Sequence, residues 1–376
     1  GWFENLAVRA NIGTVGNQNF QLSQIMTLYN FLKMYDGVMG AEIMSIANPE
    51  LKWQTTLNRN IGLEFSLLQG LVNLDFNYYS NITKNNLTDI AILPSTGFST
   101  YKANMGKVRN QGYEFSLSIT PIKKNGWIVN AFVNGAHNKN KLLNISDALR
   151  DYNEVIKENQ TAHLNYAGYT QLERIFLFEE GQSLNSIFAV RSMGIDPGTG
   201  QEIFVTADGV QTFQWNAADQ VVVGNTEPTL KGYFGLNIDY KRWSFGANFQ
   251  YSFGADRYNK TLYEKIEGGN FAQNADRRAL TQRWTKPGDV AKYRGYGNTS
   301  QLKPTSRFVQ KDDFLSMTSA RLSYTLNAND LQALGISLLK FTLSTNDLFY
   351  VSTIKQERGL SYPFARTFYF SLQANF

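Results

Sequence analysis

Apolar and polar residues alternate with a period of two along many stretches of this chain. In residues 60–67 (NIGLEFSL) the apolar side chains occupy the odd positions Ile61, Leu63, Phe65 and Leu67. Successive side chains of a β-strand point to opposite faces, so this alternation predicts a strand with one apolar and one polar face. A second such stretch, residues 71–80, follows directly after Gln69-Gly70. We expect the two stretches to form a tight hairpin.

The same alternation predicts further strands from end to end of the chain. They cover residues 6–13, 112–120, 126–135, 232–240, 242–253, 318–327, 338–346 and 366–376. Many of these runs have about ten residues, which is the length that a tilted transmembrane strand needs and exceeds the usual five or six of a soluble strand. We expect roughly a dozen strands in all, and an all-β fold.

The spacers between these strands are of two kinds. Residues 238–242 contain a short turn, whereas residues 138–183, 194–230 and 254–313 are long polar stretches. Transmembrane β-barrels have short turns on the periplasmic side and long extracellular loops, and compact soluble domains rarely contain such long connections. The spacing therefore favours a transmembrane antiparallel β-barrel with long extracellular loops.

A soluble β-sandwich or a secreted β-solenoid also has strands with one apolar face. The polar face of these strands carries Asn, Ser, Gln, Gly and Thr with scattered charge, whereas the outer face of a sandwich commonly carries Lys and Glu. This composition favours a water-filled lumen. A surface β-sandwich adhesin and a passive outer-membrane porin stay as alternatives.

Composition narrows the classes of function. Aromatic residues make up 14% of the 376 residues and charged residues only 18%, against about 25% charged in average soluble domains. The net charge of +5 forms no block, which speaks against nucleic-acid binding. There is no cysteine, and the two histidines, His137 and His163, lie far apart, so we expect no disulfide, no metal site and no cofactor. No catalytic constellation is recognisable, so we expect no enzyme.

Several stretches, in order along the chain, carry a family resemblance. They are residues 48–79 (beginning NPELKW), 93–122 (LPSTGF), 194–209 (GIDPGTG), 221–254 (VVVGNTEP), 308–326 (FVQKDDF) and 362–376 (YPFARTF). Together they resemble the C-terminal barrel portion of SusC/RagA-like TonB-dependent outer-membrane transporters.

The resemblance implies a fold and a function. Members have a 22-stranded barrel filled by a plug, so residues 1–376 are expected to be the C-terminal part of one transmembrane β-barrel domain. The plug domain, TonB box and signal peptide are expected to be absent from this chain. The resemblance implies a multi-pass protein of the bacterial outer membrane that imports oligosaccharides or peptides. The partners that it implies are a SusD-like lid lipoprotein, the TonB complex, the lipid bilayer and the remaining barrel and plug segments. A barrel closed by these strands alone is the alternative.

Two groups of residues are candidate functional sites. The C-terminal strand resembles the signal that the barrel-assembly machinery recognises, with Phe368, Phe370, Leu372 and Phe376 as its residues. Aromatic and arginine side chains of the loops are candidates for contact with substrate or lid, because rings stack on sugars and guanidinium groups bind carboxylates. These candidates are Trp215, Tyr263, Arg277, Arg278, Arg283, Trp284, Tyr293 and Tyr296. The alternative role for each is packing within a loop.

Overall fold

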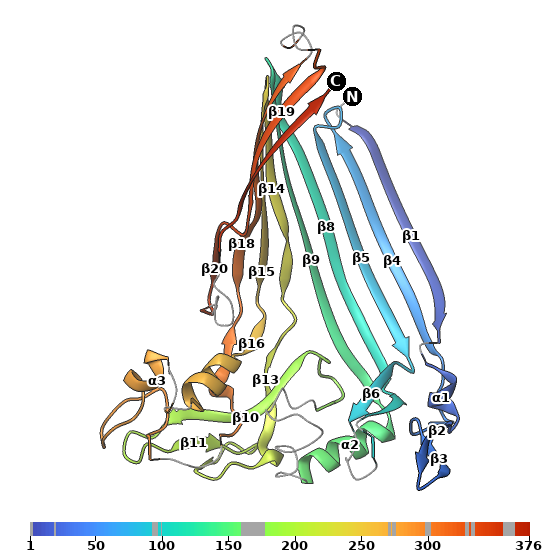
Figure 1. Ribbon diagram of the computed structural model, residues 1–376, viewed down its shortest axis with the longest axis vertical. Coiled ribbons are helices and arrows are strands. Elements are labelled where there is room, and N and C mark those ends of the chain that lie inside the picture. The colour runs from blue at the N-terminus through green and yellow to red at the C-terminus, as the bar shows by residue number, and fades with distance from the viewer. Residues whose placement is uncertain are drawn as a thin grey trace.

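The chain forms a tall, curved β-sheet with a group of loops at one end (Figure 1). The computed structural model describes residues 3–18, 20–91, 97–98, 100–158, 177–269, 272, 276–297, 302–327, 331, 335–355 and 365–376. No helix within these ranges is long and apolar enough to cross a membrane.

The sheet is an antiparallel meander in which each long strand pairs with the next long strand along the chain. Its strands, in spatial order, are β1 (Phe3–Asn17), β4 (Gln54–Leu67), β5 (Val72–Lys84), β8 (Gly106–Lys124), β9 (Trp127–Ile145), β14 (Leu230–Tyr240), β15 (Trp243–Phe253), β18 (Phe314–Asn327), β19 (Leu338–Asn346) and β21 (Phe368–Asn375). The short strand β20 (Tyr350–Ser352) pairs with β18. Each strand predicted from the alternation lies in this sheet.

Two strands are longer than the alternation predicts. β8 and β9 have 19 residues each, so residues 138–145, which we assigned to a loop, belong to β9. The alternation fades there because this part of the strand lies beyond the apolar band. Its outer side does not contact the lipid chains and does not need apolar residues.

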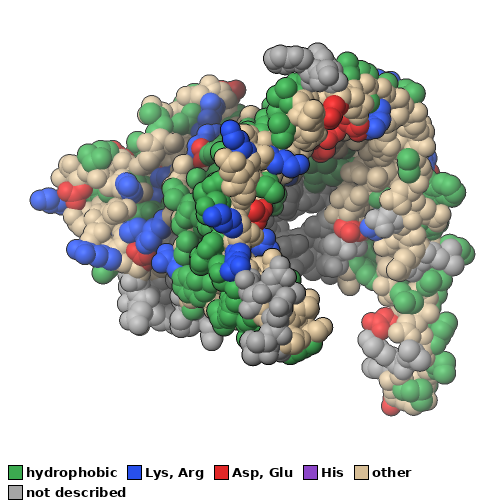
Figure 2. Space-filling model, turned by 90° about the horizontal axis from the view of Figure 1, so that it is seen from above, with side chains coloured by type: hydrophobic (Ala, Val, Ile, Leu, Met, Phe, Trp, Pro, Cys, Tyr) green, Lys and Arg blue, Asp and Glu red, His purple; other side chains and the backbone are tan. Residues whose placement is uncertain are grey.

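The described sheet does not close on itself. β1 pairs only with β4 and β21 only with β19, so the described residues form an open arc rather than a complete barrel. Viewed along the axis, the wall curves around a central hollow (Figure 2). The alternative of a barrel closed by these strands alone is therefore not found. Unpaired strand edges cannot stay exposed to lipid, so the free edges of β1 and β21 must be paired or covered in the membrane.

The register of the strands gathers the apolar side chains on the outer face. One row across neighbouring strands consists of Leu6, Phe65, Leu74, Leu117, Val133 and Phe234. The intervening positions carry polar residues such as Glu64, Asp75 and Asn134, which line the concave side. The wall thus has an apolar outer face and a polar inner face, as expected for a transmembrane barrel.

Aromatic side chains mark both borders of the apolar band. At the short-turn end Trp127 stacks on Tyr240, with ring centroids 4.1 Å apart. At the loop end Tyr113 packs against His137 at 5.2 Å. Trp127 and His137 lie ten residues apart on β9, which is about 25 Å along the barrel axis for a tilted strand. This height matches that of the apolar band of a transmembrane barrel.

The turns at one end are tight. β8 and β9 are joined by Asn125 and Gly126, both with positive φ (55° and 78°), which is typical of the turn that links two adjacent antiparallel strands. β14 and β15 are joined by Lys241 and Arg242. Since periplasmic turns are short, this end faces the periplasm and the opposite end faces outwards.

The long loops at the outer end carry their own secondary structure. It comprises α1 (Leu22–Ile25), β2 (Tyr29–Tyr35), β3 (Val38–Ile43), β6 (Leu87–Ala91), β7 (Thr100–Asn104), α2 (Asp147–Glu158), β10 (Ser186–Ile195), β11 (Glu202–Val205), β12 (Gln211–Thr212), the 3-10 helix η3 (Ala217–Asp219), β13 (Gln220–Asn225), β16 (Asp256–Tyr258), the π-helix η4 (Thr261–Glu267), α3 (Arg277–Thr281), the 3-10 helix η5 (Ser306–Phe308) and β17 (Val309–Lys311). The described residues of the polar stretches 194–230 and 254–313 therefore contain regular secondary structure.

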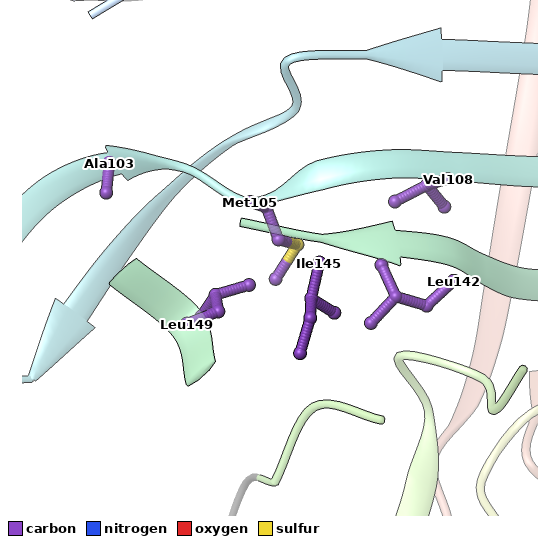
Figure 3. Close-up of a cluster of buried hydrophobic side chains, with 6 residues drawn as sticks. All are labelled: Ala103, Met105, Val108, Leu142, Ile145 and Leu149. Atoms are coloured by element: carbon purple, nitrogen blue, oxygen red, sulfur yellow. The ribbon is translucent and has the colours of Figure 1, made fainter. Parts of the chain in front are cut away.

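A small apolar core fixes part of these loops to the wall (Figure 3). It joins the outer ends of β8 and β9 to β7 and α2 through Ala103, Met105, Val108, Leu142, Ile145 and Leu149. Leu149 of α2 is completely buried there. The two longest strands of the sheet thus extend beyond the others at the outer end and support the loops.

We predict that charge is tolerated on the inner face of the wall but not on the outer face. In the complete transporter, Leu117→Arg should cost about 2–4 kcal/mol because it places a cation in the middle of the apolar band. The neighbouring Ser116→Arg faces the lumen and should change stability far less. Urea unfolding from lipid vesicles measures both. Equal destabilisation by the two variants would contradict this assignment of the faces.

Candidate functional site

A polar groove follows the concave face of the wall. Its main hollow has a volume of about 740 Å³ and is lined by residues of β1, β4, β5, β8, β9, β14 and β15. The charged side chains in it are Arg9, Glu64, Asp75, Glu114 and Lys231. Arg9 and Glu64 form a bidentate ion pair, with Nη2 2.7 Å from Oε2. The surface that faces the lumen is therefore polar and of mixed charge.

The groove continues towards the loops through a surface rich in asparagine. A second hollow, of about 630 Å³, is lined by Asn11, Asn58, Asn60, Asn77, Asn81, Asn110 and Asn138, together with Tyr79, Glu114, Glu227 and other residues. The Tyr79 hydroxyl donates to Asn138 Oδ1 at 3.0 Å, and Asn140 Nδ2 donates to Asn110 Oδ1 at 2.8 Å. These neutral amides can donate and accept hydrogen bonds along the path.

A third hollow, of about 430 Å³, connects the wall to the base of the loops. It lies between the outer part of β9 and residues 181–186 and 222–229. Glu227 accepts hydrogen bonds there from the Asn138 side chain and from the backbone N–H of Asn140. The three hollows share lining residues, so they form one groove from the middle of the wall to the loops.

A buried ion network joins two of the outer loops. Arg307 reaches Glu202 of β11 with Nη2–Oε2 at 2.9 Å and Glu267 of η4 with Nη1–Oε2 at 2.8 Å. Arg294 Nε lies 2.9 Å from the other oxygen of Glu267. We call these four residues the Arg307 network. Because both carboxylates are buried, the network is held by charge in a region shielded from water.

The electrostatics of Glu267 follow from its neighbours. Burial alone would raise the pKa of this carboxyl group, but the charge of Arg307 and hydrogen bonds from Arg307 and Arg294 outweigh that effect. The pKa of Glu267 consequently lies below its usual value, and the pKa of Arg307 is raised by its two carboxylate partners despite the opposing effect of burial. Glu267 and Arg307 are therefore both ionised at neutral pH.

Arg283, a candidate for substrate or lid contact, holds the loop backbone together. Its guanidinium group donates to the carbonyl oxygens of Ala279 at 2.8 Å, Ile266 at 2.6 Å, Glu267 at 2.5 Å and Arg294 at 3.2 Å. The residue is only 8% exposed. In this structure its donors are occupied by the loops rather than turned towards the lumen.

The four candidate aromatic residues other than Tyr296 also turn into the loops. The Tyr263 hydroxyl donates to Leu302 O at 3.1 Å. Tyr293 is buried in a small cluster with Ile266 and Ala279. The indole N–H groups of Trp215 and Trp284 donate to backbone carbonyls, those of Pro304 (3.1 Å) and Pro197 (2.8 Å).

The three other candidates lie nearer the surface. Arg278 forms a bidentate pair with Asp276, and its hydrogen bonds lower the pKa of that carboxyl group to about 2. Arg277 is exposed, and Tyr296 is 47% exposed. Contact of the eight candidates with substrate or lid stays a prediction. Of the eight, Arg277 and Tyr296 are the best placed for such contact because their side chains are exposed.

Three of the C-terminal candidates, Phe368, Phe370 and Leu372, lie on β21, and Phe376 follows its last residue. Phe370 pairs with Leu343 and Leu372 pairs with Phe341, which places both on the apolar outer face. Phe368, Phe370, Leu372 and Phe376 are all strongly exposed, between 57% and 90%. They stand where lipid would cover them, which agrees with the alternation in the sequence.

The sequence alone did not single out the residues that line the groove as candidates for contact with a solute. Glu64, Asp75 and Glu114 each occupy a polar position between two apolar ones, so the alternation placed them on the polar face. It did not reveal that strands far apart in sequence bring them into one hollow. Lys231 joins them from β14, more than a hundred residues after Glu114.

Comparisons with known proteins agree with this architecture. Residues 1–176 match the family described as TonB dependent receptor-like, beta-barrel. The chain is 27% identical to the TonB-dependent receptor P39 of Formosa agariphila over 93% of this chain and 37% of that protein. It is 24% identical to the TonB-dependent receptor SusC of Bacteroides thetaiotaomicron over 72% of this chain and 27% of that protein.

A solved structure has the same fold. The chain superposes on the structure of the RagAB peptide transporter with a TM-score of 0.77 and 23% identity, covering 94% of this chain and 38% of the other. The fold and the groove define the wall of an outer-membrane barrel. In fold and in these similarities the chain resembles the barrel of SusC/RagA-like TonB-dependent transporters of the outer membrane. It spans little more than a third of the length of the Formosa agariphila relatives that it matches.

We predict that Arg307→Met loosens the loops. Removing this cation leaves Glu202 and Glu267 buried beside too little positive charge, which should cost about 3–5 kcal/mol in local stability. Amide hydrogen exchange in residues 202–205 and 261–267 measures the loss. Arg277→Met removes the same charge from an exposed position and is the matched control, expected to change stability by about 0.5 kcal/mol or less. Equal effects would show that the network does not hold the loops.

The same network predicts a dependence on pH. A carboxyl group whose pKa is lowered by folding stabilises the folded state above its ordinary pKa of 4.5, and this contribution disappears as the pH falls through the lowered value. Relative to the intrinsic exchange rate at the same pH, hydrogen exchange of residues 261–267 should therefore accelerate well below pH 4.5. In Glu267→Gln the acceleration should be smaller, and an unchanged acid response in that variant would assign the effect to other groups.

Proposed function

We propose that this chain forms part of the wall and the outer loops of an importer that takes up oligosaccharides or peptides across the outer membrane. The observation that carries the proposal is the continuous groove of polar and charged side chains on the concave face of an apolar-backed wall. Amides and ion pairs of both signs give a hydrophilic solute many weak, exchangeable hydrogen bonds. Such contacts suit passage better than permanent binding. We propose no catalytic role for the groove.

We further propose that a SusD-like lipoprotein covers the outer end and that a TonB complex supplies the energy through a plug within the completed barrel. The similar solved structures are those of a peptide transporter and a peptide importer, and the likeness to SusC supports the proposed lipoprotein partner. On this chain, the exposed apolar side chains of the hairpin formed by β2 and β3 support the proposal of a protein partner. Its Met34, Val38 and Met39 side chains are 66–69% exposed at the outer end.

Deletion of the gene for the complete transporter tests the proposal. Uptake of a labelled oligosaccharide mixture and of a labelled peptide mixture is compared in the parent and deletion strains. We expect one of the two mixtures to lose uptake on deletion and to regain it with the intact gene. Dissipating the proton gradient should abolish the same uptake. Normal uptake of both mixtures in the deletion strain would overturn the import proposal, and uptake that survives without the gradient would indicate a passive porin.

The C-terminal strand supports a second proposal, that Phe368, Phe370, Leu372 and Phe376 form the signal for barrel assembly. Replacing Phe370 and Phe376 by Ser should lower the amount of folded transporter in the outer membrane severalfold, because the apolar outer face of β21 is what an assembly factor would read. Replacing the inward-facing Ser371 and Gln373 by Ala is the matched control. Heat-modifiable migration on gels reports folding, and equal yields from both variants would contradict the proposal.

A further inference from the structure

Basic side chains gather on the outer face of the wall, just beyond the aromatic residues at the outer border of the apolar band. Six of them belong to four neighbouring strands, namely Arg59, Lys84, Lys107, Arg109, Lys139 and Lys141. We call these six residues the basic belt. The register places each on the same face as Phe65, Leu74, Leu117 and Val133, the face that lipid covers.

The height of the basic belt follows from a single strand. The outward positions of β9 are, in order, Trp127, Val129, Ala131, Val133, Gly135, His137, Lys139 and Lys141. Trp127 and His137 mark the two borders of the apolar band. Lys139 and Lys141 are the next two outward positions, so they stand about 5–10 Å beyond the apolar band. This is the level of lipid headgroups on the outer side of the membrane.

Like charges stand directly opposite one another within the basic belt. Lys84 of β5 pairs in register with Lys107 of β8, and Arg109 of β8 pairs with Lys141 of β9. Side chains in such pairs are about 5 Å apart at Cβ, and like charges directly opposite are destabilising. Two such pairs side by side repel unless an anion lies among them.

The described residues supply no such anion. None of the six cations forms an ion pair with a described carboxylate, and Arg109 Nε is buried without a hydrogen-bond partner. Glu180, an acidic residue near the outer end of β9, is engaged by Arg150 at 3.2 Å and by the backbone of Ile145. The basic belt therefore has positive charge in excess and donor capacity to spare.

We propose that the basic belt binds the phosphate groups of a lipid in the outer leaflet of the membrane. A phosphorylated headgroup would stand between the opposed cations while its acyl chains lie against the apolar band directly below. Lysine and arginine suit this position because their long apolar stems follow the wall while the charged ends reach the headgroup level. The inference goes beyond solute import, because the ligand is bound on the outside of the wall.

The location selects a lipid over a free anion. A soluble phosphate would meet only the charges, whereas a lipid meets the charges and the apolar wall together. Arg59, Lys84, Lys107 and Arg109 line no part of the groove, whereas Lys139 and Lys141 also border its third hollow. Each cation at a membrane surface contributes about a fivefold gain in binding, so removing three should weaken binding on the order of a hundredfold.

The test uses the complete transporter in detergent and diphosphorylated lipid A as the probe, with retained lipid counted by native mass spectrometry. The variant R109Q/K139Q/K141Q should lose lipid on the order of a hundredfold more readily than the parent. The matched control, K123Q/K124Q, removes exposed lysines at the short-turn end and should retain it. K139R/K141R keeps the charge and should bind as the parent does. Heat-modifiable migration confirms that each variant is folded.

Two further arms decide the source of the phosphate. Dephosphorylated lipid A should bind the parent no better than it binds the triple variant, and inorganic phosphate at equal concentration should not displace the phosphorylated lipid. Equal retention of lipid by the parent and the triple variant would overturn the proposal. So would displacement by inorganic phosphate, because the belt would then be a general anion site.

Discussion

The lack of hydrogen-bonding water inside a lipid bilayer is the constraint on which this structure depends. Every backbone N–H and C=O group in the membrane must find its partner within the sheet. Between its two edge strands, β1 and β21, the wall meets that demand with a continuous antiparallel ladder that contains a few local register shifts. The same constraint explains why the tight turns, such as Asn125–Gly126, lie at the membrane border rather than within the apolar band.

The ladder also determines which side chains face the lipid and which face the lumen, because successive residues of each strand point to opposite faces of the sheet. On β8, Phe115 and Leu117 face lipid while Glu114 and Ser116 face the groove. On β9 the outward positions change from apolar to aromatic to basic with height. A single strand therefore contributes to the apolar band and to the basic belt on its outer face. On its inner face it contributes to the polar groove.

This periodic part of the fold could be predicted from the sequence, since alternation is a local signal that each strand carries by itself. The strands around Phe65, Leu117 and Phe245 were found in this way. The outer loops could not be predicted, because their structure depends on contacts between distant residues: Arg307 meets Glu202 across 105 positions. Arg283 shows the same limit. Its residue type suggested contact with solute or lid, whereas its partners, the carbonyl oxygens of other loop residues, are visible only in three dimensions.

The loops differ from the wall in what holds them together, and the reason is their surroundings. In the wall, lipid covers the apolar side chains, so no interior core is needed between the two faces. The loops stand in water and have only small apolar clusters, such as the one around Leu149. Directional interactions then have to fix their shape, and the Arg307 network and the Arg283 hydrogen bonds do so. Because removal of one buried charge leaves its partners unpaired, this design makes the loops rigid but sensitive to single substitutions.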